Sequence, residues 1–173
     1  MQKIIDKYKN MALSDRQVLQ LVEGKANIIL YPDLYKYSHL DQILEPYGAC
    51  FLLYEAKPSF GHWCCLLKTF DKKGPVIEFF DPYGGFPDSQ RKYIPELFRK
   101  MSNQNVPHLS YLLLNSPYEL SYNQYPFQKM GNGIKDCGRW CSLRIILRDL
   151  TLDQFADLFY NKYSDDLATF LTM

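Results

Sequence analysis

The sequence lacks any long hydrophobic run, although 47% of its 173 residues are hydrophobic. A membrane-spanning helix needs about 20 consecutive apolar residues, and the first residues lack the apolar stretch of a secretory signal peptide. Charge of neither sign dominates, because the formal net charge is +1, which gives no general electrostatic reason to bind nucleic acid. We therefore expect a soluble protein that stays inside a cell or a virus particle.

Cysteine and histidine are too few and too scattered for a zinc site. There are five cysteines and three histidines, and the Cys-x-x-x-Cys run at 137–141 lacks a second close pair of ligands. The odd cysteine count argues against a disulfide framework, and the adjacent Cys64 and Cys65 would point to opposite faces of a strand. The sequence predicts a reduced, intracellular protein with no metal and no cofactor.

No repeat, linker or low-complexity tract divides the chain. Its length suits one domain with a substantial core, and 16% aromatic residues are typical of a folded protein. We predict a single domain over residues 1–173. It comprises a helical part at about 1–25, a core at about 50–150 and C-terminal helices at about 151–171.

Apolar runs predict four strands, at 50–55, 61–70, 75–80 and 108–114. The turn at 71–74 joins the second and third strands in a hairpin. Continuous apolar runs of this kind suggest a sheet that is covered on both faces. Residues 27–31 read as a short strand or a buried connector, and residues 115–125 as a polar connection.

Helical spacing of apolar residues predicts helices before and after these strands. They are two pieces within 1–25, a turn at 40–44, an amphipathic helix at 89–102, and helices at 137–150, 151–160 and 167–171. Ser14 and Gln17 form a capping box for the second piece, and Thr151 is a cap. The predicted fold class is α+β, with a central, mostly antiparallel sheet flanked by helices.

Cys137 stands where helical spacing begins, after a stretch that cannot readily start a helix. Gly131, Asn132 and Gly133 favour turns and positive φ, and Asp136 is a good N-cap. A thiol in the first helical turn meets the positive end of the helix dipole, which favours the thiolate. The charge of Asp136 opposes that shift, so a nearby imidazolium has to supply most of the activation. The ordinary alternative is a small buried cysteine.

A cysteine nucleophile needs a base within hydrogen-bond reach and a third group that orients this base. His62 follows Gly61 at the start of one hairpin strand, and Asp81 ends the other strand 19 residues later. Because a tight turn places the start of one strand opposite the end of its partner, we expect His62 and Asp81 to be neighbours. His39 and His108 have no comparable acidic partner. The ordinary alternative is that His62 is a surface or core residue with its hydrogen bonds satisfied, and that Asp81 opens a common Asp-Pro turn.

The order His62, Asp81, Gln128, Cys137 resembles that of the cysteine peptidases that include the SUMO and ubiquitin-like-protein proteases and adenain, the adenovirus maturation protease. Three runs look like the adenain-like proteases of virophages, Polinton-type elements and related large DNA viruses. They are Tyr-Asn-x-Tyr-x-x-Gln at 122–128, Cys-Gly-Arg-Trp at 137–140 and Leu-Asp-Gln-Phe at 152–155. The resemblance implies the adenain and SUMO-protease type of the papain-like fold.

By this resemblance, Cys137 is the nucleophile, His62 is the general base and acid, and Asp81 orients His62 and stabilises its imidazolium. The side-chain amide of Gln128 and the backbone N–H of Cys137 form the oxyanion hole. Gln128 lies nine residues before Cys137, farther than the family usually places it. Either residues 129–134 bulge outward, or Gln124 takes the role across a still larger loop.

The resemblance also implies a narrow channel over the scissile bond. Trp63 matches the aromatic residue that helps to wall this channel, and Gly138 is a second expected substrate-binding position. A narrow channel admits a glycine-rich segment, so the resemblance implies cleavage after small residues, Gly above all.

The predicted function is a cysteine endopeptidase that processes capsid or other virion precursors, located in the virion and the host-cell cytoplasm. The expected partner is a protein substrate, and a monomer is favoured. Binding to a membrane is not expected, and binding to nucleic acid is possible but is not supported by the net charge. One alternative is an isopeptidase that acts on ubiquitin-like modifiers. An acyltransferase of the related branch needs a cofactor site that the sequence does not show. The non-enzyme alternative is a catalytically silent binding module.

Overall fold

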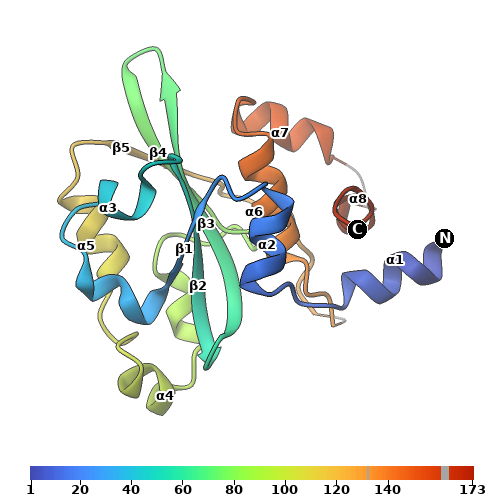
Figure 1. Cartoon of the computed structure of the whole chain (residues 1–173), viewed down its shortest axis with the longest axis horizontal. Coiled ribbons are helices and arrows are strands. Elements are labelled where there is room, and N and C mark those ends of the chain that lie inside the picture. The colour runs from blue at the N-terminus through green and yellow to red at the C-terminus, as the bar shows by residue number, and fades with distance from the viewer. Residues whose placement is uncertain (132, 161–163) are drawn as a thin grey trace.

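In the computed structural model, helices enclose a five-stranded sheet within the described residues, 1–131, 133–160 and 164–173 (Figure 1). The strands lie side by side in chain order. They are β1 (Asn27–Leu30), β2 (Ala49–Lys57), β3 (Phe60–Asp71), β4 (Gly74–Phe80) and β5 (Glu119–Tyr122).

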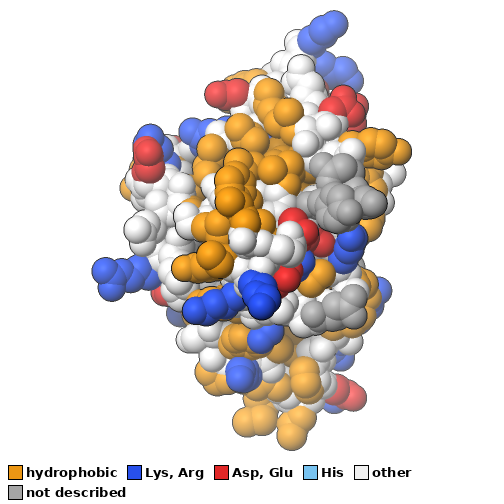
Figure 2. Space-filling model, turned by 90° about the vertical axis from the view of Figure 1, so that its right-hand side faces the viewer, with side chains coloured by type: hydrophobic (Ala, Val, Ile, Leu, Met, Phe, Trp, Pro, Cys, Tyr) orange, Lys and Arg blue, Asp and Glu red, His pale blue; other side chains and the backbone are white. Residues whose placement is uncertain are grey.

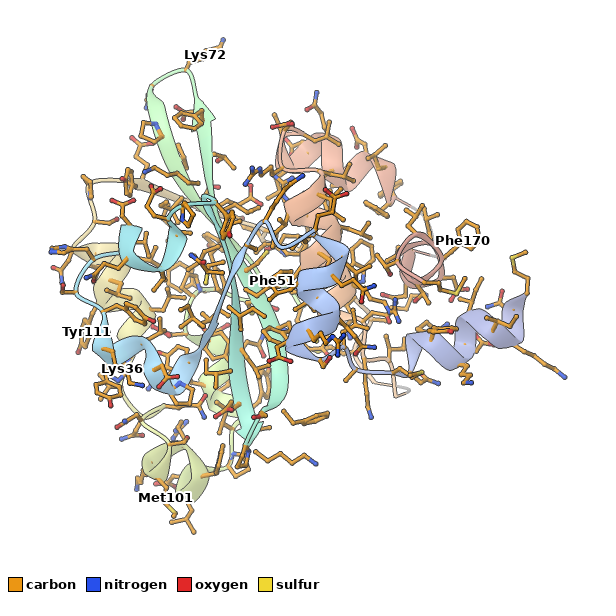
Figure 3. The ribbon with its side chains drawn as sticks, in the orientation of Figure 1. Lys36, Phe51, Lys72, Met101, Tyr111 and Phe170 are labelled. Carbon is orange, nitrogen blue, oxygen red and sulfur yellow. The ribbon has the colours of Figure 1, made fainter. Side chains whose placement is uncertain are left out.

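The three long strands form an antiparallel meander, and each short edge strand adds a parallel pair. The predicted hairpin turn at 71–74 is confirmed, and Oδ1 of Asp71 accepts the N–H groups of Lys73 and Gly74. This hairpin projects beyond the helices, with Lys72 at its tip (Figure 3). The parallel edges were not predicted, because strands of four residues carry too little periodicity to reveal their direction.

Helices lie on both sides of the sheet (Figure 1). On one side are the 3-10 helix η1 (Tyr31–Lys36), α3 (Asp41–Leu44), α4 (Glu96–Met101) and α5 (His108–Leu114). On the other are α1 (Gln2–Lys9), α2 (Asp15–Leu21), α6 (Cys137–Ile146), α7 (Leu152–Leu158) and α8 (Ser164–Leu171). The predicted α+β class with a sheet flanked by helices is therefore confirmed.

Two helix starts have the side-chain bonds that the sequence predicted. Ser14 and Gln17 form a reciprocal capping box at α2, and Thr151 forms one with Gln154 at α7. Each box satisfies two backbone N–H groups that a helix start leaves without intrahelical partners.

Two predicted elements are wrong. Residues 108–114 form α5 and not a strand, because their buried leucines recur at helical spacing. These are Leu109, Leu112 and Leu113. The single helix at 89–102 is instead the 3-10 helix η2 (Ser89–Tyr93) followed by α4, with Pro95 between them. Proline lacks the N–H that a continuous helix would need there. The polar connection at 115–125 also contains β5.

Each face of the sheet has its own hydrophobic core, as the continuous apolar runs predicted. Phe51, Cys65 and Phe80 belong to the core shared with α2, α6 and α7 (Figure 3 labels Phe51). Leu52 and Phe79 belong to the core shared with η1, α3 and α5. Because successive strand residues alternate between faces, both sets of side chains are buried away from solvent.

The face that carries α1, α7 and α8 displays broad hydrophobic surface (Figure 2). Tyr160 is 91% exposed and Leu158 is 54% exposed.

Among the helices of the described residues, none has the length and apolar character required to cross a bilayer.

A buried ion pair ties α6 to the sheet. The guanidinium of Arg144 donates Nε–H and Nη2–H to the two carboxylate oxygens of Glu78 at 2.7 and 3.0 Å. Arg144 also donates to the carbonyls of Leu147 and Leu150, beyond the end of α6. Removing one partner of such a pair leaves an uncompensated buried charge.

We predict that Glu78→Gln lowers the free energy of unfolding by about 3–5 kcal/mol, because Arg144 then stays buried without its counter-charge. The matched control is Glu119→Gln, which removes an exposed partner of Lys73 at 4.0 Å and should cost about 1 kcal/mol or less. Urea unfolding measures both variants. Equal losses would show that the Glu78–Arg144 pair does not hold α6 in place.

Candidate active site

Asp81 follows β4 directly, and its buried carboxylate accepts four hydrogen bonds. Oδ1 accepts from Nε2 of His62 at 2.7 Å and from the backbone N–H of Tyr83 at 2.9 Å. Oδ2 accepts from the N–H of Gly85 at 3.1 Å and from the side-chain amide of Gln90 at 2.5 Å. An added Cβ at Gly85 would lie 2.4 Å from Oδ2, so a larger residue there would displace the carboxylate. Four donors stabilise the ionised carboxylate although it is buried.

Two neighbours fix the imidazole of His62, and the residue before it has to be glycine. Asp81 holds Nε2, and the ring of Tyr83 stacks on the imidazole with centroids 4.5 Å apart and 8° between the planes. Gly61 lies beside a register shift between β2 and β3, where an added Cβ would lie 1.8 Å from the carbonyl oxygen of Tyr54. Because Nε2 is bonded to Asp81, Nδ1 is the ring nitrogen left for Cys137.

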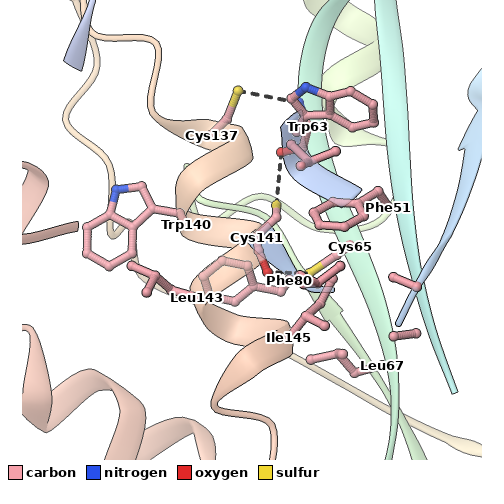
Figure 4. Packing of buried hydrophobic residues seen from close by; sticks show 14 of the residues in the cluster. Phe51, Trp63, Cys65, Leu67, Phe80, Cys137, Trp140, Cys141, Leu143 and Ile145 are labelled. Atoms are coloured by element: carbon pink, nitrogen blue, oxygen red, sulfur yellow. Dashed lines mark hydrogen bonds between the residues drawn. The ribbon is translucent and has the colours of Figure 1, made fainter. Parts of the chain in front are cut away.

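Cys137 is the first residue of α6, as predicted, and Asp136 occupies the N-cap position. The backbone N–H of Trp63 donates to Sγ of Cys137 at 3.5 Å (Figure 4). Since Trp63 follows His62 directly in β3, this contact brings the thiol to the strand that carries the imidazole. The positive end of the α6 dipole and this N–H donor both favour negative charge on the sulfur.

The charged forms of the three side chains support one another. Burial works against protonation of His62, but interactions with Asp81 and Cys137 outweigh burial and raise the pKa of the imidazole to about 9. Burial alone would raise the pKa of Asp81, but the hydrogen bonds and charge of its neighbours, His62 first, lower it. An imidazolium at neutral pH is the partner that a thiolate at Cys137 requires.

Small side chains bring the start of α6 close to β3. An added Cβ at Gly138 would lie 3.0 Å from Val18 and 3.1 Å from Trp63. One turn later, Sγ of Cys141 donates to the carbonyl of Trp63 at 3.4 Å (Figure 4). Gly138 therefore lies in the packing between α2, α6 and β3, and its predicted contact with substrate stays a prediction.

Trp63 is likewise buried, with 4% of the residue exposed. Its Nε1–H donates to the carbonyl of Leu13 at 3.0 Å, and its ring meets Phe51 edge to face. The chain just before α2 thus covers the indole. Its role as a channel wall stays a prediction, because the ring lies beneath this cover.

Gln128 is the glutamine that lies beside the catalytic candidates. It is 2% exposed, and its side-chain amide donates to the hydroxyl of Tyr83 at 3.4 Å and to the carbonyl of Ile134 at 3.2 Å. Gln124 is exposed. The positive φ values predicted near the loop are present at Gly131 and Gly133, whereas Asn132 lies outside the described residues.

Helix α8 bonds to the loop that follows Gln128 and to the start of α6. Asp165 accepts the indole Nε1–H of Trp140 at 3.0 Å and the backbone N–H of Lys129 at 3.2 Å. The hydroxyl of Thr169 donates to Asp136 at 3.0 Å. Just beyond α8, Thr172 accepts the guanidinium of Arg139 through its carbonyl and its hydroxyl, at 2.7 and 2.9 Å. The C-terminal helix thus bonds to both sides of Cys137.

Asp136 does not cap α6 with its side chain. Burial raises the pKa of this carboxyl to about 7, against the hydrogen bond from Thr169 and the charge of Arg139. At neutral pH, its negative charge beside Cys137 is therefore only partly present. The opposition between Asp136 and a thiolate is smaller than the sequence suggested.

His62, Asp81 and Cys64 are the described residues that come nearest to a metal site. Their potential ligand atoms lie within 4.8 Å of one another. However, the Nε2 atom of His62 and the Oδ1 atom of Asp81 are bonded to each other, so a metal would have to replace that bond. Burial raises the pKa of the Cys64 thiol well above its usual value, which makes it a poor ligand and a poor nucleophile.

Three site residues were missed in the sequence. Gln90 and Tyr83 contact Asp81 and His62 as described above, and Asn123 holds the backbone of Asp81 by accepting its N–H at 3.0 Å and donating to its carbonyl at 2.6 Å. Gln90 lay in a predicted surface helix and carried no signal. Asn123 and Tyr83 belong to short runs, Tyr-Asn-x-Tyr and Asp-Pro-Tyr, whose spacing alone does not reveal a contact.

The site combines a thiol, an imidazole and a carboxylate contributed by three separate elements. Such an arrangement can move a proton from sulfur to the ring and present a nucleophilic thiolate beside an amide donor. The fold and the site thus define an α+β protein with a cysteine, histidine and aspartate constellation at a helix N-terminus.

The family of this protein follows from a sequence relative. "Uncharacterized protein V9" of Sputnik virophage is 49% identical over 163 residues, which cover 94% of this chain and 89% of that protein. The chain belongs to the same family as this virophage protein. No protein-family model matches the chain.

Solved structures of the SUMO protease Ulp1 give a more distant likeness. Ulp1 with its catalytic cysteine oxidised to a sulfinic acid is 16% identical, with a TM-score of 0.45, and the match covers 93% of this chain and 75% of that chain. The form oxidised to a sulfenic acid is 14% identical, with a TM-score of 0.46 and coverage of 94% and 76%.

The raised pKa of His62 predicts a pH dependence of stability. The folded protein keeps the imidazole proton between pH 6.5 and about 9, whereas the unfolded chain releases it. This contribution, about 3 kcal/mol, is therefore complete below pH 6.5 and is lost as the pH rises through 9.

Urea unfolding at a series of pH values from 6 to 10 measures this dependence. We expect His62→Gln to remove that part of the slope, while the control His39→Gln, at an exposed position, keeps it. Parallel curves for wild type and His62→Gln would contradict the raised pKa.

Proposed function

We propose that this protein is a cysteine endopeptidase with Cys137 as nucleophile, His62 as general base and acid, and Asp81 as the residue that orients His62. The observation that carries the proposal is the buried 2.7 Å bond between His62 and Asp81 beside a thiol at the first residue of α6. A structural cysteine would need neither an oriented imidazole nor a raised imidazole pKa.

In the first half-reaction, the Cys137 proton passes to Nδ1 of His62, and the thiolate attacks the carbonyl carbon of the scissile amide. The carbonyl π electrons move to oxygen, and the resulting oxyanion is stabilised by the N–H of Cys137 and the amide of Gln128. When this intermediate collapses, the C–N bond breaks, and His62 gives its proton to the leaving amine. The product is a thioester on Cys137.

In the second half-reaction, His62 takes a proton from water, and the hydroxide adds to the thioester carbonyl. The C–S bond then breaks, the carboxylic acid leaves, and the proton returns to the sulfur. Asp81 remains ionised throughout, because its role is to hold the ring and to balance the imidazolium charge.

For the substrate, we propose virion precursor proteins with glycine-rich sites. The virophage relative supports a viral role, and the low exposure of Cys137, 7% of the residue, favours a substrate segment with small side chains. Cleavage of a capsid precursor, compared with cleavage of a reporter fused to a ubiquitin-like modifier, separates virion processing from isopeptidase activity.

Thiol labelling provides the direct test of the nucleophile and its base. A peptide vinyl sulfone ending in glycine should label wild type, and labelling should disappear in Cys137→Ala and fall sharply in His62→Ala, because the thiolate depends on the imidazolium. Cys141→Ala is the matched control and should keep labelling. Equal labelling of wild type and the first two variants would favour a catalytically silent binding module.

The oxyanion donor is tested separately. Gln128→Ala should lower kcat on a glycine-rich peptide by on the order of 10²–10³, while alkylation of Cys137 by iodoacetamide, which forms no oxyanion, should stay unchanged. Gln124→Ala, at the exposed glutamine, should retain full activity. The opposite result for the two glutamines would assign the role to Gln124.

A further inference from the structure

Tyr83 is placed in the site by the turn that follows Asp81. Its backbone N–H is bonded to the Asp81 carboxylate, and the N–H of Gly84 closes the turn on the Asp81 carbonyl at 2.8 Å. Gly84 has a φ of +75°, and an added Cβ would lie 2.7 Å from the carbonyl carbon of Tyr125. Both the backbone conformation and the lack of space therefore require glycine after Tyr83.

The same turn also holds Gln128. The carbonyl of Pro82 accepts the backbone N–H groups of Phe127 and Gln128 at 2.9 and 3.0 Å. Tyr83 and Gln128 are therefore joined twice, through this backbone contact and through the bond between their side chains. These contacts hold Gln128 against the turn that carries Tyr83, although 45 residues separate the two side chains along the chain.

The phenol of Tyr83 reaches from the imidazole to the amide. The aromatic ring of Tyr83 is stacked on the imidazole of His62, and its hydroxyl lies 3.4 Å from Nε2 of Gln128. These are the two groups that flank the thiol in the proposed mechanism.

The hydrogen bonds around Tyr83 leave its hydroxyl proton available to a bound substrate. One N–H of the Gln128 amide donates to the Ile134 carbonyl at 3.2 Å, and the other lies 3.4 Å from the Tyr83 oxygen, a long contact that it can exchange for the oxyanion. Because the Tyr83 oxygen accepts from the amide, its own proton points elsewhere. Burial, followed by the charges of Cys137 and Asp81, raises the pKa of Tyr83 to about 12, so the hydroxyl keeps this proton at neutral pH.

We propose that Tyr83 is a further catalytic residue, whose hydroxyl donates a hydrogen bond to the oxyanion alongside the Gln128 amide and the Cys137 N–H. The inference rests on the proposed peptidase function. When the thiolate adds to the carbonyl, the new negative charge on oxygen accepts the O–H of Tyr83 without proton transfer. The hydroxyl of Tyr83 and one N–H of the Gln128 amide then each donate to the charged oxygen.

Tyr83→Phe tests this role, because phenylalanine keeps the ring that stacks on His62 and removes only the hydroxyl. We expect kcat on a fluorogenic glycine-rich peptide to fall on the order of 10²-fold with little change in KM. A peptide aldehyde, whose adduct places an oxygen at the same position, should bind Tyr83→Phe more weakly by a similar factor. Tyr111→Phe, which removes a hydroxyl from the exposed side of α5, is the matched control.

Iodoacetamide alkylation of Cys137 distinguishes this role from an effect on the thiol or the imidazole. Alkylation forms no oxyanion, so its rate and pH profile should be the same in wild type and Tyr83→Phe. Slower alkylation in the variant would assign Tyr83 to His62 and overturn the oxyanion role, as would an unchanged kcat. A wild type that cleaves no peptide would overturn the peptidase function itself, whereas an active wild type with a fully active Tyr83→Phe would overturn only this inference.

Discussion

The carboxylate of Asp81 is the group around which the site is assembled. It holds the imidazole, the turn that carries Tyr83, the backbone of Gly85 and the amide of Gln90. An ionised carboxylate inside a protein is tolerated only when donors surround it, so each of these contacts also satisfies the charge. The same bonds that make Asp81 stable in the interior therefore determine where His62 points.

A second constraint is the short distance between α6 and β3. Gly138 and Cys141 occupy the contact, and larger side chains there would push the helix away from the strand. Moving α6 outward would separate Sγ of Cys137 from the N–H of Trp63 and from the imidazole of His62. The geometry of the candidate site thus depends on packing between small residues as well as on polar bonds. The buried Arg144–Glu78 pair fixes the far end of the helix.

The sequence predicted the places of His62, Asp81 and Cys137 in the fold better than it predicted their surroundings, and their catalytic roles stay predictions. His62, Asp81 and Cys137 were identifiable because strand starts, strand ends and helix starts have local signals. The 108–114 run was assigned to the wrong element, because a short apolar run fits a strand or a helix until its partners are known. Gln90 and Tyr83 could not be predicted, since their roles arise from contacts across loops. Gln128 was favoured over Gln124, and its burial beside Tyr83 supports that choice.

Helix α8 links the candidate site to helix α1. Asp165 bonds to Lys129 and Trp140, and Thr169 bonds to Asp136, so α8 contacts the chain on both sides of Cys137. Helix α8 also meets α1, where Asp166 pairs with Lys9 at 2.5 Å. Residues 165–169 therefore bond to the loop that follows Gln128, to the residue before Cys137 and to α6 itself. Any change that loosens α8 would therefore also loosen the polypeptide on both sides of the thiol.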